Sequence, residues 1–476
     1  MKSNPAAIHL TRIVATVGPA SSSPEMVEKL IGAGVDVFRL NFSHGSHEQH
    51  EGVYRTIRSV AEKLGQWVAI MQDISGPKLR IGEFTAGSIE LAPGGRFRLQ
   101  RDLPAGDANR VGFKEEGWFE FVAPTHRMVL GDGQIVLRII RKDDQGLDCE
   151  VLSGGTVRSR WGLNFPDSRI ELGAITEKDR IDIAFGKQLG VDAMAISFVQ
   201  SADDLKAAKA VLGNDAPHPL LIAKIEHPVA LERIDSIIAE ADGIMVARGD
   251  LGITIPIEQV PTVQKRLIHL CRDRGKLVIT ATQMLESMTT APQPTRAEVT
   301  DVANAVYDGT DAVMLSGETA VGTDPVRVVD MMGRILREAE PHALFPEPPR
   351  IDRTIEGAMA VAVADLVKEL KARVVLVPIT SGSTAARISR QRVGVPIVAG
   401  ATDTAAARKM KFYSGVFPVL TDGKASLLNS LKIVLAQAQA RKWVKNGDHA
   451  IATGGFPVTR RGITNFVRAI TVGEEL

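Results

Sequence analysis

Two acidic residues and one lysine follow two consecutive apolar runs of the chain, in a pattern that suits metal-assisted phosphate or enolate chemistry. Lys224 and Glu226 end the run 220–226, and Asp250 comes just after the run 243–247. Strand alternation places Lys224 and Glu226 on the same side of the strand end. Carboxylate oxygens suit Mg²⁺ or Mn²⁺, and an ammonium group beside the metal stabilises a phosphate or an enolate. A surface salt-bridge network is the alternative interpretation.

The elements that carry these residues alternate between strand-like and helical patterns. Eight apolar runs, each followed by a helical segment, favour a closed (β/α)8 TIM barrel over an open doubly wound sheet. The expected strands are residues 13–17, 35–40, 67–72, 191–198, 220–226, 243–247, 276–281 and 311–316. In such barrels the chemistry lies at the carboxyl ends of the strands. The polar residues there are Arg39, Asn41, Ser43, Asp73, Lys224, Glu226, Asp250, Thr282 and Glu318.

The alternation of strand-like and helical segments is interrupted twice, once by an insertion and once by a proline-rich segment, which predicts three domains. Residues 76–160 are rich in glycine and short strand-like runs, and they predict an inserted small β-barrel lid domain. The α/β catalytic domain then comprises residues 1–75 and 161–340. The proline-rich segment 341–349 predicts a linker. Residues 350–476 predict a C-terminal α/β regulatory domain with strands at 374–379, 396–399, 417–420 and 449–452.

The composition excludes several classes of protein. The chain has 57 basic and 56 acidic residues, so nothing favours a nucleic acid or an anionic membrane as its main partner. Two cysteines cannot build a disulfide framework. The N-terminus lacks the apolar segment of a signal peptide, and no run is long enough to span a bilayer. We therefore expect a cytoplasmic protein.

Several long segments of the chain resemble the pyruvate kinase family, in family order and over essentially the whole length. The resemblance implies Mg²⁺-dependent (or Mn²⁺-dependent) transfer of the phosphoryl group of phosphoenolpyruvate to ADP, which gives pyruvate and ATP in the last step of glycolysis, by a homotetramer. The matching segments are TRIVATVGPAS at 11–21, FRLNFSHG at 38–45, DISGPKLR at 73–80, AKIEHP at 223–228, MVARGDLG at 245–252, ATQMLESM at 281–288 and PTRAEVTDVANAVYDGTDAVMLSGETA at 294–320.

The resemblance also implies roles for the residues at the strand ends. Lys224 would neutralise the transferring phosphoryl group, Arg39 would clamp a phosphate, and Thr282 would orient the substrate or the water that protonates the enolate. Glu226 and Asp250 would hold Mg²⁺. The implied substrate contacts come from Arg39, Lys224, Gly249, Asp250 and Thr282, with Gly249 donating its backbone N–H to the substrate carboxylate.

By the same resemblance, a neighbouring group of residues holds a monovalent cation and the nucleotide. The cation positions are Asn41, Ser43, Asp73 and Ile74, and the nucleotide positions are Asn41, His44 and Arg80. For His44, an ordinary loop-capping role remains equally open. Lys78 stands where many relatives have Glu, and its ammonium group near Asp73 and Ser43 would replace the charge of K⁺. We therefore predict a K⁺-independent enzyme.

Other departures from the family pattern concern the lid and the nucleotide. His227 follows Lys-Ile-Glu, where Asn or Ser is usual, and Gln66 replaces a common Arg. Trp161 stands in place of a Lys at the exit of the insert, with Arg160 as the nearest cation.

A phosphate-binding loop is predicted in the C-terminal domain, where a strand runs into hydroxyl residues at the start of a helix. By resemblance it binds a phosphorylated metabolite, and the poor match of residues 454–461 to a bisphosphate loop favours a monophosphate. A plain capped helix is the alternative. The residues are Thr380, Ser381, Gly382, Ser383 and Thr384.

Two other functions remain open from the sequence. A Mg²⁺-dependent lyase or aldolase acting on pyruvate enolate would share the carboxylates and the lysine, but it has no reason to carry the lid or the C-terminal domain. A non-catalytic metabolite-sensing relative would be expected to have lost Lys224, Arg39 or an acidic ligand.

Overall fold

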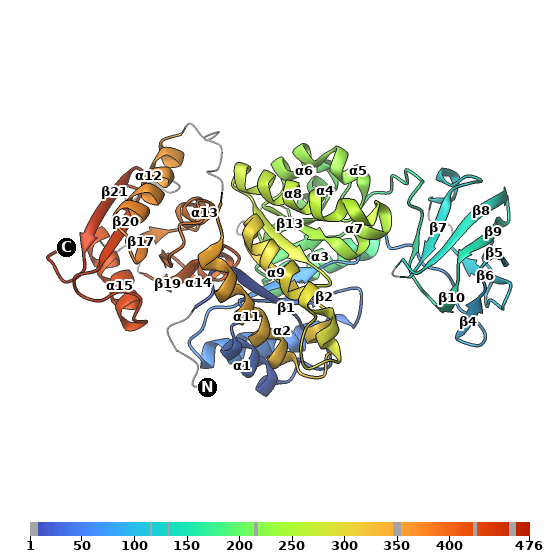
Figure 1. Ribbon diagram of the computed structural model, residues 1–476, viewed down its shortest axis with the longest axis horizontal. Helices are drawn as coiled ribbons and strands as arrows, with labels where there is room; N and C mark the ends of the chain where they lie inside the picture. The colour runs from blue at the N-terminus through green and yellow to red at the C-terminus, as the bar shows by residue number, and fades with distance from the viewer. Residues whose placement is uncertain are drawn as a thin grey trace.

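Eight parallel strands form a closed barrel at the centre of the molecule. They are β1 (Arg12–Thr16), β2 (Val37–Asn41), β3 (Ala69–Asp73), β12 (Ala193–Ile196), β13 (Leu220–Ile225), β14 (Gly243–Ala247), β15 (Leu277–Ala281) and β16 (Ala312–Leu315). Around the barrel their order is β1-β16-β15-β14-β13-β12-β3-β2, which confirms the predicted (β/α)8 barrel. The structure is a computed structural model that describes residues 8–114, 117–131, 133–213, 218–345, 354–421, 426–456 and 463–476 (Figure 1).

The barrel strands are apolar on both faces, so each needs a partner on both sides. Ile13 and Ala15 of β1 pack with the helices outside the barrel, whereas Val14 belongs to the interior cluster. The helices are α1 (Pro24–Ala33), α2 (His47–Lys63), α3 (Glu177–Leu189), α4 (Ala202–Leu212), α5 (Pro228–Glu232), α6 (Ile234–Glu240), α7 (Arg248–Thr254), α8 (Val260–Arg274), α9 (Arg296–Asp308), α10 (Gly317–Ala320) and α11 (Pro325–Ala339). Short 3₁₀ turns span Ile257–Gln259, Glu286–Thr289 and Glu340–His342.

The inserted domain consists of strands packed around a separate apolar core. Its strands are β4 (Ser88–Leu91), β5 (Arg96–Arg101), β6 (Arg110–Phe113), β7 (Arg127–Leu130), β8 (Ile135–Asp143), β9 (Gly146–Ser153), β10 (Gly155–Arg158) and β11 (Leu163–Asn164), with a 3₁₀ turn at Phe119–Phe121. The sheet order is β11-β7-β8-β9-β5-β6, with β10 and β4 paired separately. Because β11 pairs with β7, and Phe165 and Ile170 pack in this core, the domain extends about ten residues beyond the predicted boundary at 160.

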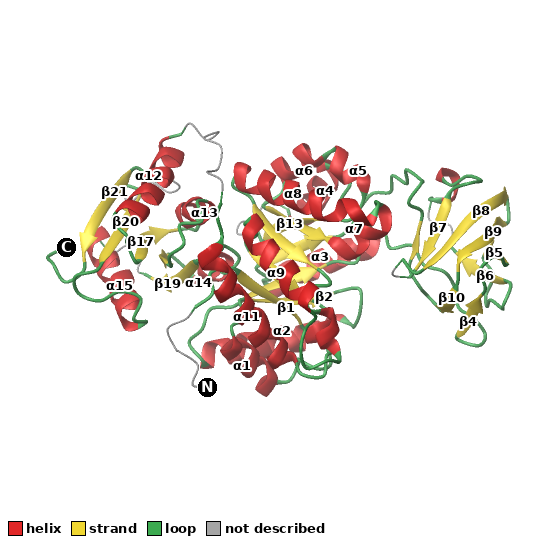
Figure 2. Cartoon of the chain, viewed as in Figure 1, coloured by secondary structure: helices red, strands yellow, loops and turns green. Residues whose placement is uncertain are grey.

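The C-terminal domain is a five-stranded sheet covered by helices (Figure 2). Its elements are α12 (Ile355–Glu369), β17 (Val374–Thr380), α13 (Ser383–Arg390), β18 (Ile397–Ala401), α14 (Thr404–Met410), β19 (Val416–Leu420), α15 (Leu427–Ala440), β20 (His449–Gly454) and β21 (Phe466–Thr471). The order is β19-β18-β17-β20-β21, and only the last pair is antiparallel. Residues 346–349 of the predicted linker, the domain start at 350, and residues 457–461 lie outside the described residues.

Buried ion pairs attach the C-terminal domain to the amino-terminal end of the barrel. Asp36 directly precedes β2 and pairs with Lys411 at 2.5 Å and Arg12 at 3.2 Å. Arg408 similarly pairs at 2.9 Å with Asp192, the residue before β12. The C-terminal and inserted domains therefore lie at opposite ends of the barrel, as Figure 1 shows. Among the described residues, no helix is both long enough and apolar enough to span a membrane.

Candidate active site

Lys224 lies at the centre of a charged cluster at the carboxyl end of the barrel. Its Nζ atom donates a hydrogen bond to Ser197 Oγ at 2.7 Å and lies 3.0 Å from Glu226 Oε1 and 3.3 Å from Asp73 Oδ1. The side chain is almost fully buried. Burial lowers the pKa of Lys224, but Asp73 and Glu226 outweigh it and raise this pKa above its ordinary value. The lysine is therefore a fixed positive charge in a site of low water content.

Asp73 connects this lysine to Arg39 on a neighbouring strand. Arg39 donates from Nε to Asp73 Oδ2 at 2.6 Å and from Nη1 to Thr16 Oγ1 at 3.0 Å. Burial raises the pKa of Asp73, yet Arg39 and Lys224 lower it below its usual range. One carboxylate thus holds two cations in fixed positions, which is suited to binding a phosphate.

Glu226 and Asp250 are arranged as the protein half of a divalent-cation site. Glu226 Oε2 accepts a hydrogen bond from the backbone N–H of Phe198 at 2.6 Å, whereas Oε1 pairs with Lys224 Nζ at 3.0 Å. Burial raises the pKa of Glu226 above its ordinary value; Lys224 opposes this rise without cancelling it, and Asp250 adds to it. Two carboxylates that lie close together fit a hard cation.

Two carboxylates leave the remaining coordination positions to substrate and water, as is usual for Mg²⁺. The described residues contain no group of three or more His, Cys, Asp or Glu side chains that would hold a metal alone.

Thr282 and Gly249 contact each other at the next two strand ends. The Gly249 backbone N–H donates to Thr282 Oγ1 at 2.8 Å, so the group predicted to bind a substrate carboxylate is engaged by the threonine in this state. Thr282 has a φ of 69°, a strained conformation of the kind that clusters at functional sites. An added Cβ at Gly249 would lie 3.5 Å from Thr282 Oγ1, an ordinary contact. The need for glycine here would therefore come from the substrate.

Arg248 positions this pair and was missed by the sequence analysis. It is buried, donates to Asp301 Oδ2 at 2.6 Å, and reaches the carbonyl oxygens of Ala281 at 3.2 Å and Thr282 at 2.5 Å. Its position just before Gly249 in the MVARGDLG segment was the available signal. Ser197 was also missed, because nothing near it in the sequence marks it as a partner of Lys224.

The predicted cation and nucleotide residues lie on two adjacent loops. Asn41 Oδ1 accepts from the Ser43 backbone N–H at 3.2 Å, and Ser43 Oγ lies 3.2 Å from Ser75 Oγ. Ser197 Oγ also donates to the Ile74 carbonyl oxygen at 2.7 Å. These contacts join the ends of β2, β3 and β12.

His44 is exposed on the first of these loops. Partial burial lowers its pKa, and so do the nearby charges of Arg80, Lys78 and Arg39. Arg80 itself donates to the Arg160 carbonyl oxygen at 2.9 Å. The His44 side of the rim is therefore cationic.

Lys78 has an ion-pair partner that the sequence did not predict. Its Nζ atom is 3.7 Å from Asp250 Oδ1, and its charge also lowers the pKa of His44, the residue after Ser43. The lysine follows Gly76 and Pro77 in an irregular segment, so strand alternation could not fix its direction. The nearby Trp161 covers Gly131 and packs against the core of the inserted domain.

Glu318 caps the turn after β16. Its Oε2 accepts from the Ser316 N–H at 2.6 Å, and its Oε1 accepts from the Leu285 N–H at 3.1 Å.

The predicted effector loop has its residues at one helix start. Gly382 precedes α13 with a φ of 117°, and its N–H donates to Thr380 Oγ1 at 2.9 Å. Thr384 Oγ1 lies 2.8 Å from Thr464 Oγ1, whereas Ser381 is exposed and Ser383 half-buried.

Comparison with known proteins gives a consistent result over the whole chain. Residues 8–329 match the family model described as pyruvate kinase, barrel domain, and residues 357–470 match that of pyruvate kinase, alpha/beta domain. A pyruvate kinase of Agrobacterium vitis is 43% identical over 472 residues, which is 97% of this chain and 96% of that protein. Pyruvate kinases of Staphylococcus aureus (strain MRSA252) and Sporosarcina psychrophila are each 40% identical over 98% of this chain and 81% of theirs.

Proposed function

The chain belongs to the pyruvate kinase family, and we propose a division of roles among its residues for the reaction of that family. The enzyme transfers the phosphoryl group of phosphoenolpyruvate to ADP and releases pyruvate, the last step of glycolysis. A lyase or a sensor without activity is not favoured. The observation that carries the proposal is the buried ammonium of Lys224, held between Asp73, Glu226 and Ser197 beside Arg39.

Lys224 and Arg39 act on the phosphoryl group. The transition state of phosphoryl transfer is loose and spreads negative charge over the equatorial oxygens, so fixed positive charges stabilise it more than the ground state. Both cations are oriented by Asp73 before substrate arrives, which avoids a reorganisation cost during the reaction.

Glu226 and Asp250 would hold Mg²⁺ or Mn²⁺, which when bound supplies further positive charge to the phosphoryl oxygens. The closeness of the two carboxylates, which is reflected in the rise that Asp250 causes in the pKa of Glu226, supports this role. Thr282 orients the substrate or the water that protonates the enolate. Its contact with the Gly249 N–H places the hydroxyl beside the group that receives the substrate carboxylate.

Asn41, His44 and Arg80 contact the nucleotide. The charges of Arg80, Lys78 and Arg39 around His44 support an anionic ligand on this side of the rim. Asn41, Ser43, Asp73 and Ile74 form the monovalent-cation site, and Lys78 supplies the charge of K⁺. The inserted domain covers the bound substrates and excludes water.

At the level of the assembly, we infer a cytoplasmic homotetramer. Thr380, Ser381, Gly382, Ser383 and Thr384 bind a phosphorylated effector, because hydroxyl and N–H groups converge at the start of α13.

The test is a coupled assay of pyruvate formation from phosphoenolpyruvate and ADP with Mg²⁺. Lys224→Met should lower kcat by several orders of magnitude, while phosphoenolpyruvate binding remains measurable. Glu226→Gln and Asp250→Asn should also raise the Mg²⁺ concentration needed for half-maximal activity. Lys276→Met is the control, because Lys276 donates to backbone oxygens near the opposite end of the barrel. Near-normal turnover of Lys224→Met would refute the assignment.

A further inference from the structure

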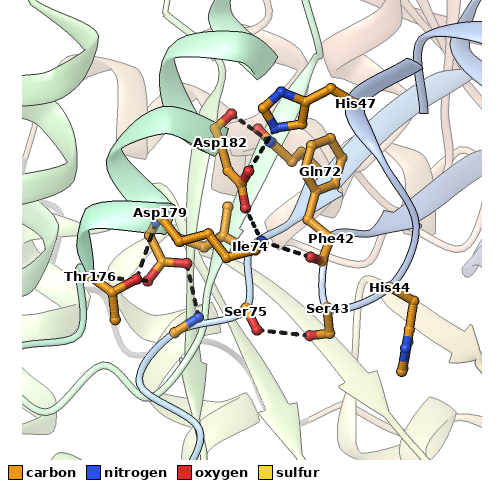
Figure 3. A network of polar contacts seen from close by, with 12 residues as sticks. Phe42, Ser43, His44, His47, Gln72, Ile74, Ser75, Thr176, Asp179 and Asp182 are labelled. Carbon is orange, nitrogen blue, oxygen red and sulfur yellow. Dashed lines mark hydrogen bonds and ion pairs between the residues drawn. The ribbon is translucent and has the colours of Figure 1, made fainter. Parts of the chain in front are cut away.

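The first turns of α3 lie directly behind the two loops that carry the proposed cation and nucleotide residues. One loop follows β2 and contains Ser43 and His44, and the other follows β3 and leads into the inserted domain. Figure 3 shows side chains of α3 reaching both loops. None of these α3 side chains belongs to the site described above.

Lys178 and Asp182 hold the first loop. Lys178 Nζ donates to the Phe42 backbone oxygen at 3.0 Å and to Asp182 Oδ2 at 2.5 Å, although most of the lysine side chain is exposed. Asp182 is buried and its Oδ1 lies 2.7 Å from His47 Nε2. The ring of His47 stacks on Phe185 at 4.0 Å between centroids. The loop is therefore fixed at Phe42, directly before Ser43, and again at His47, three residues after His44.

Asp179 holds the second loop. Its Oδ1 accepts from the Gly76 N–H at 3.1 Å, while Oδ2 accepts from the Thr176 N–H at 2.9 Å and from Thr176 Oγ1 at 2.6 Å. An ordinary capping box needs only the contacts with Thr176. Gly76 has a φ of 67°, and a Cβ there would lie 3.0 Å from Ser197 Cβ. Gly76 is thus packed against the serine that holds Lys224.

The contacts of Lys178, Asp179 and Asp182 cost free energy that the packing of an ordinary helix does not require. Asp179 and Asp182 are both buried, and buried carboxylates are unfavourable unless every oxygen has a partner. Lys178 gives up conformational freedom to bond a backbone carbonyl that water would otherwise reach. Besides contacts within α3 and its cap, each of the three side chains has one partner in or next to the two loops, which is the Phe42 oxygen for Lys178, the Gly76 N–H for Asp179 and His47 for Asp182.

We propose that Lys178, Asp179 and Asp182 are positioning residues, which set the loop of Ser43 and His44 and the entry to the inserted domain relative to each other. The inference rests on the proposed role of that loop in binding the nucleotide. Substitution at these positions then weakens ADP more than phosphoenolpyruvate, because Lys224 and Arg39 keep their own partners.

The experiment compares Lys178→Met with Lys187→Met in the full-length enzyme. Lys187 lies on the last turn of the same helix, and its Nζ also donates to a backbone oxygen, that of Leu212, at 2.6 Å. Both changes remove a contact with a backbone oxygen, and Lys178→Met also removes the ion pair with Asp182. For Lys178→Met we expect KM for ADP to rise about tenfold, the effect of losing one charged hydrogen bond. KM for phosphoenolpyruvate should change less than about twofold, and Lys178→Arg should restore most of the loss.

Three outcomes decide the matter. If both lysine variants lower Tm equally but only Lys178→Met raises KM for ADP, the positioning role is supported. If Lys178→Met lowers Tm alone, with unchanged KM for ADP, α3 has a structural role and the inference is wrong. His44→Ala separates this inference from its premise, because a variant that leaves KM for ADP unchanged would show that the loop does not bind nucleotide. Asp182→Asn, which keeps the shape of the side chain, should reproduce the effect of Lys178→Met.

Discussion

Replacing Lys78 by Glu should convert the enzyme, which we propose to be K⁺-independent, into a K⁺-activated one. The Lys78 ammonium is 3.7 Å from Asp250 Oδ1 and is carried by a flexible stem. Because a divalent cation bound by Asp250 competes for the same carboxylate, we expect the ammonium to move toward the oxygens of Ser43 and Asn41 when the site fills. A glutamate in its place would add a negative charge where the cation site needs a positive one.

The size of the expected effect on the rate follows from the strength of one charge contact of Lys78. Two unit charges 3.7 Å apart attract by about 4.5 kcal/mol at an effective dielectric constant of about 20. However, the two side chains are 34% and 29% exposed, and exposed pairs contribute only about 1 kcal/mol. For a contact of the same order at the filled cation site, Lys78→Glu loses about 1 kcal/mol of attraction and gains about 1 kcal/mol of repulsion, which is about 30-fold in rate without K⁺.

The assay is pyruvate formation in a tetramethylammonium buffer, with and without KCl. We expect wild type to be indifferent to KCl, Lys78→Glu to recover most of its activity in KCl, and the neutral Lys78→Met to show a smaller activation. Arg96→Glu makes the same change of net charge on an exposed position of the inserted domain and should respond like wild type. Strong K⁺ activation of the wild type would refute the reasoning, and so would a Lys78→Glu variant that works equally well without K⁺.

Two further predictions concern regions away from the active site. Burial raises the pKa of Asp36, but Lys411 and Arg12 lower it to about 2, so this pair stabilises the fold above pH 4 and ceases to do so as the pH falls toward 2. Asp36→Asn should cost about 3–5 kcal/mol at neutral pH and remove this acid dependence of Tm, whereas Asp330→Asn, in an exposed pair, should change little. Ser383→Glu should abolish activation by AMP or a sugar monophosphate without changing the basal rate; persistent activation would contradict the effector site.

The sequence predicted the residues of the rim well because the fold itself brings them together. The carboxyl ends of parallel strands meet at one edge, so Arg39, Lys224, Glu226 and Asp250 had to converge once the eight strands were recognised. The strand β21 was missed because it lies on the edge of its sheet, where of its six residues only Ile470 is buried, and it leaves no clear alternating pattern.

What the sequence did not predict are partners that depend on the direction of irregular segments. Lys78 was expected beside Ser43 but pairs with Asp250, because the chain leaves β3 through Gly76 in a left-handed conformation. The Gly249 N–H was assigned to substrate alone, yet the strained backbone at Thr282 brings its hydroxyl within 2.8 Å. The directions of the Lys78 and Thr282 side chains do not follow from the two-residue period of a strand or the 3.6-residue period of a helix.

The geometry of the site also explains why a single carboxylate, Asp73, matters as much as the residues proposed to touch substrate. Its two oxygens bind different cations, Oδ2 with Arg39 and Oδ1 with Lys224, so neither cation depends on the substrate for its orientation. Arg39 uses only Nε and Nη1 for its described hydrogen bonds, to Asp73 and Thr16, and a guanidinium has further donors for a phosphate. If Asp73 were neutral, Arg39 would lose its carboxylate partner and Lys224 would keep only Glu226, so one carboxylate fewer would oppose the lowering of the Lys224 pKa by burial. The charge that the transition state requires is therefore maintained by a residue that need not contact the transferred group.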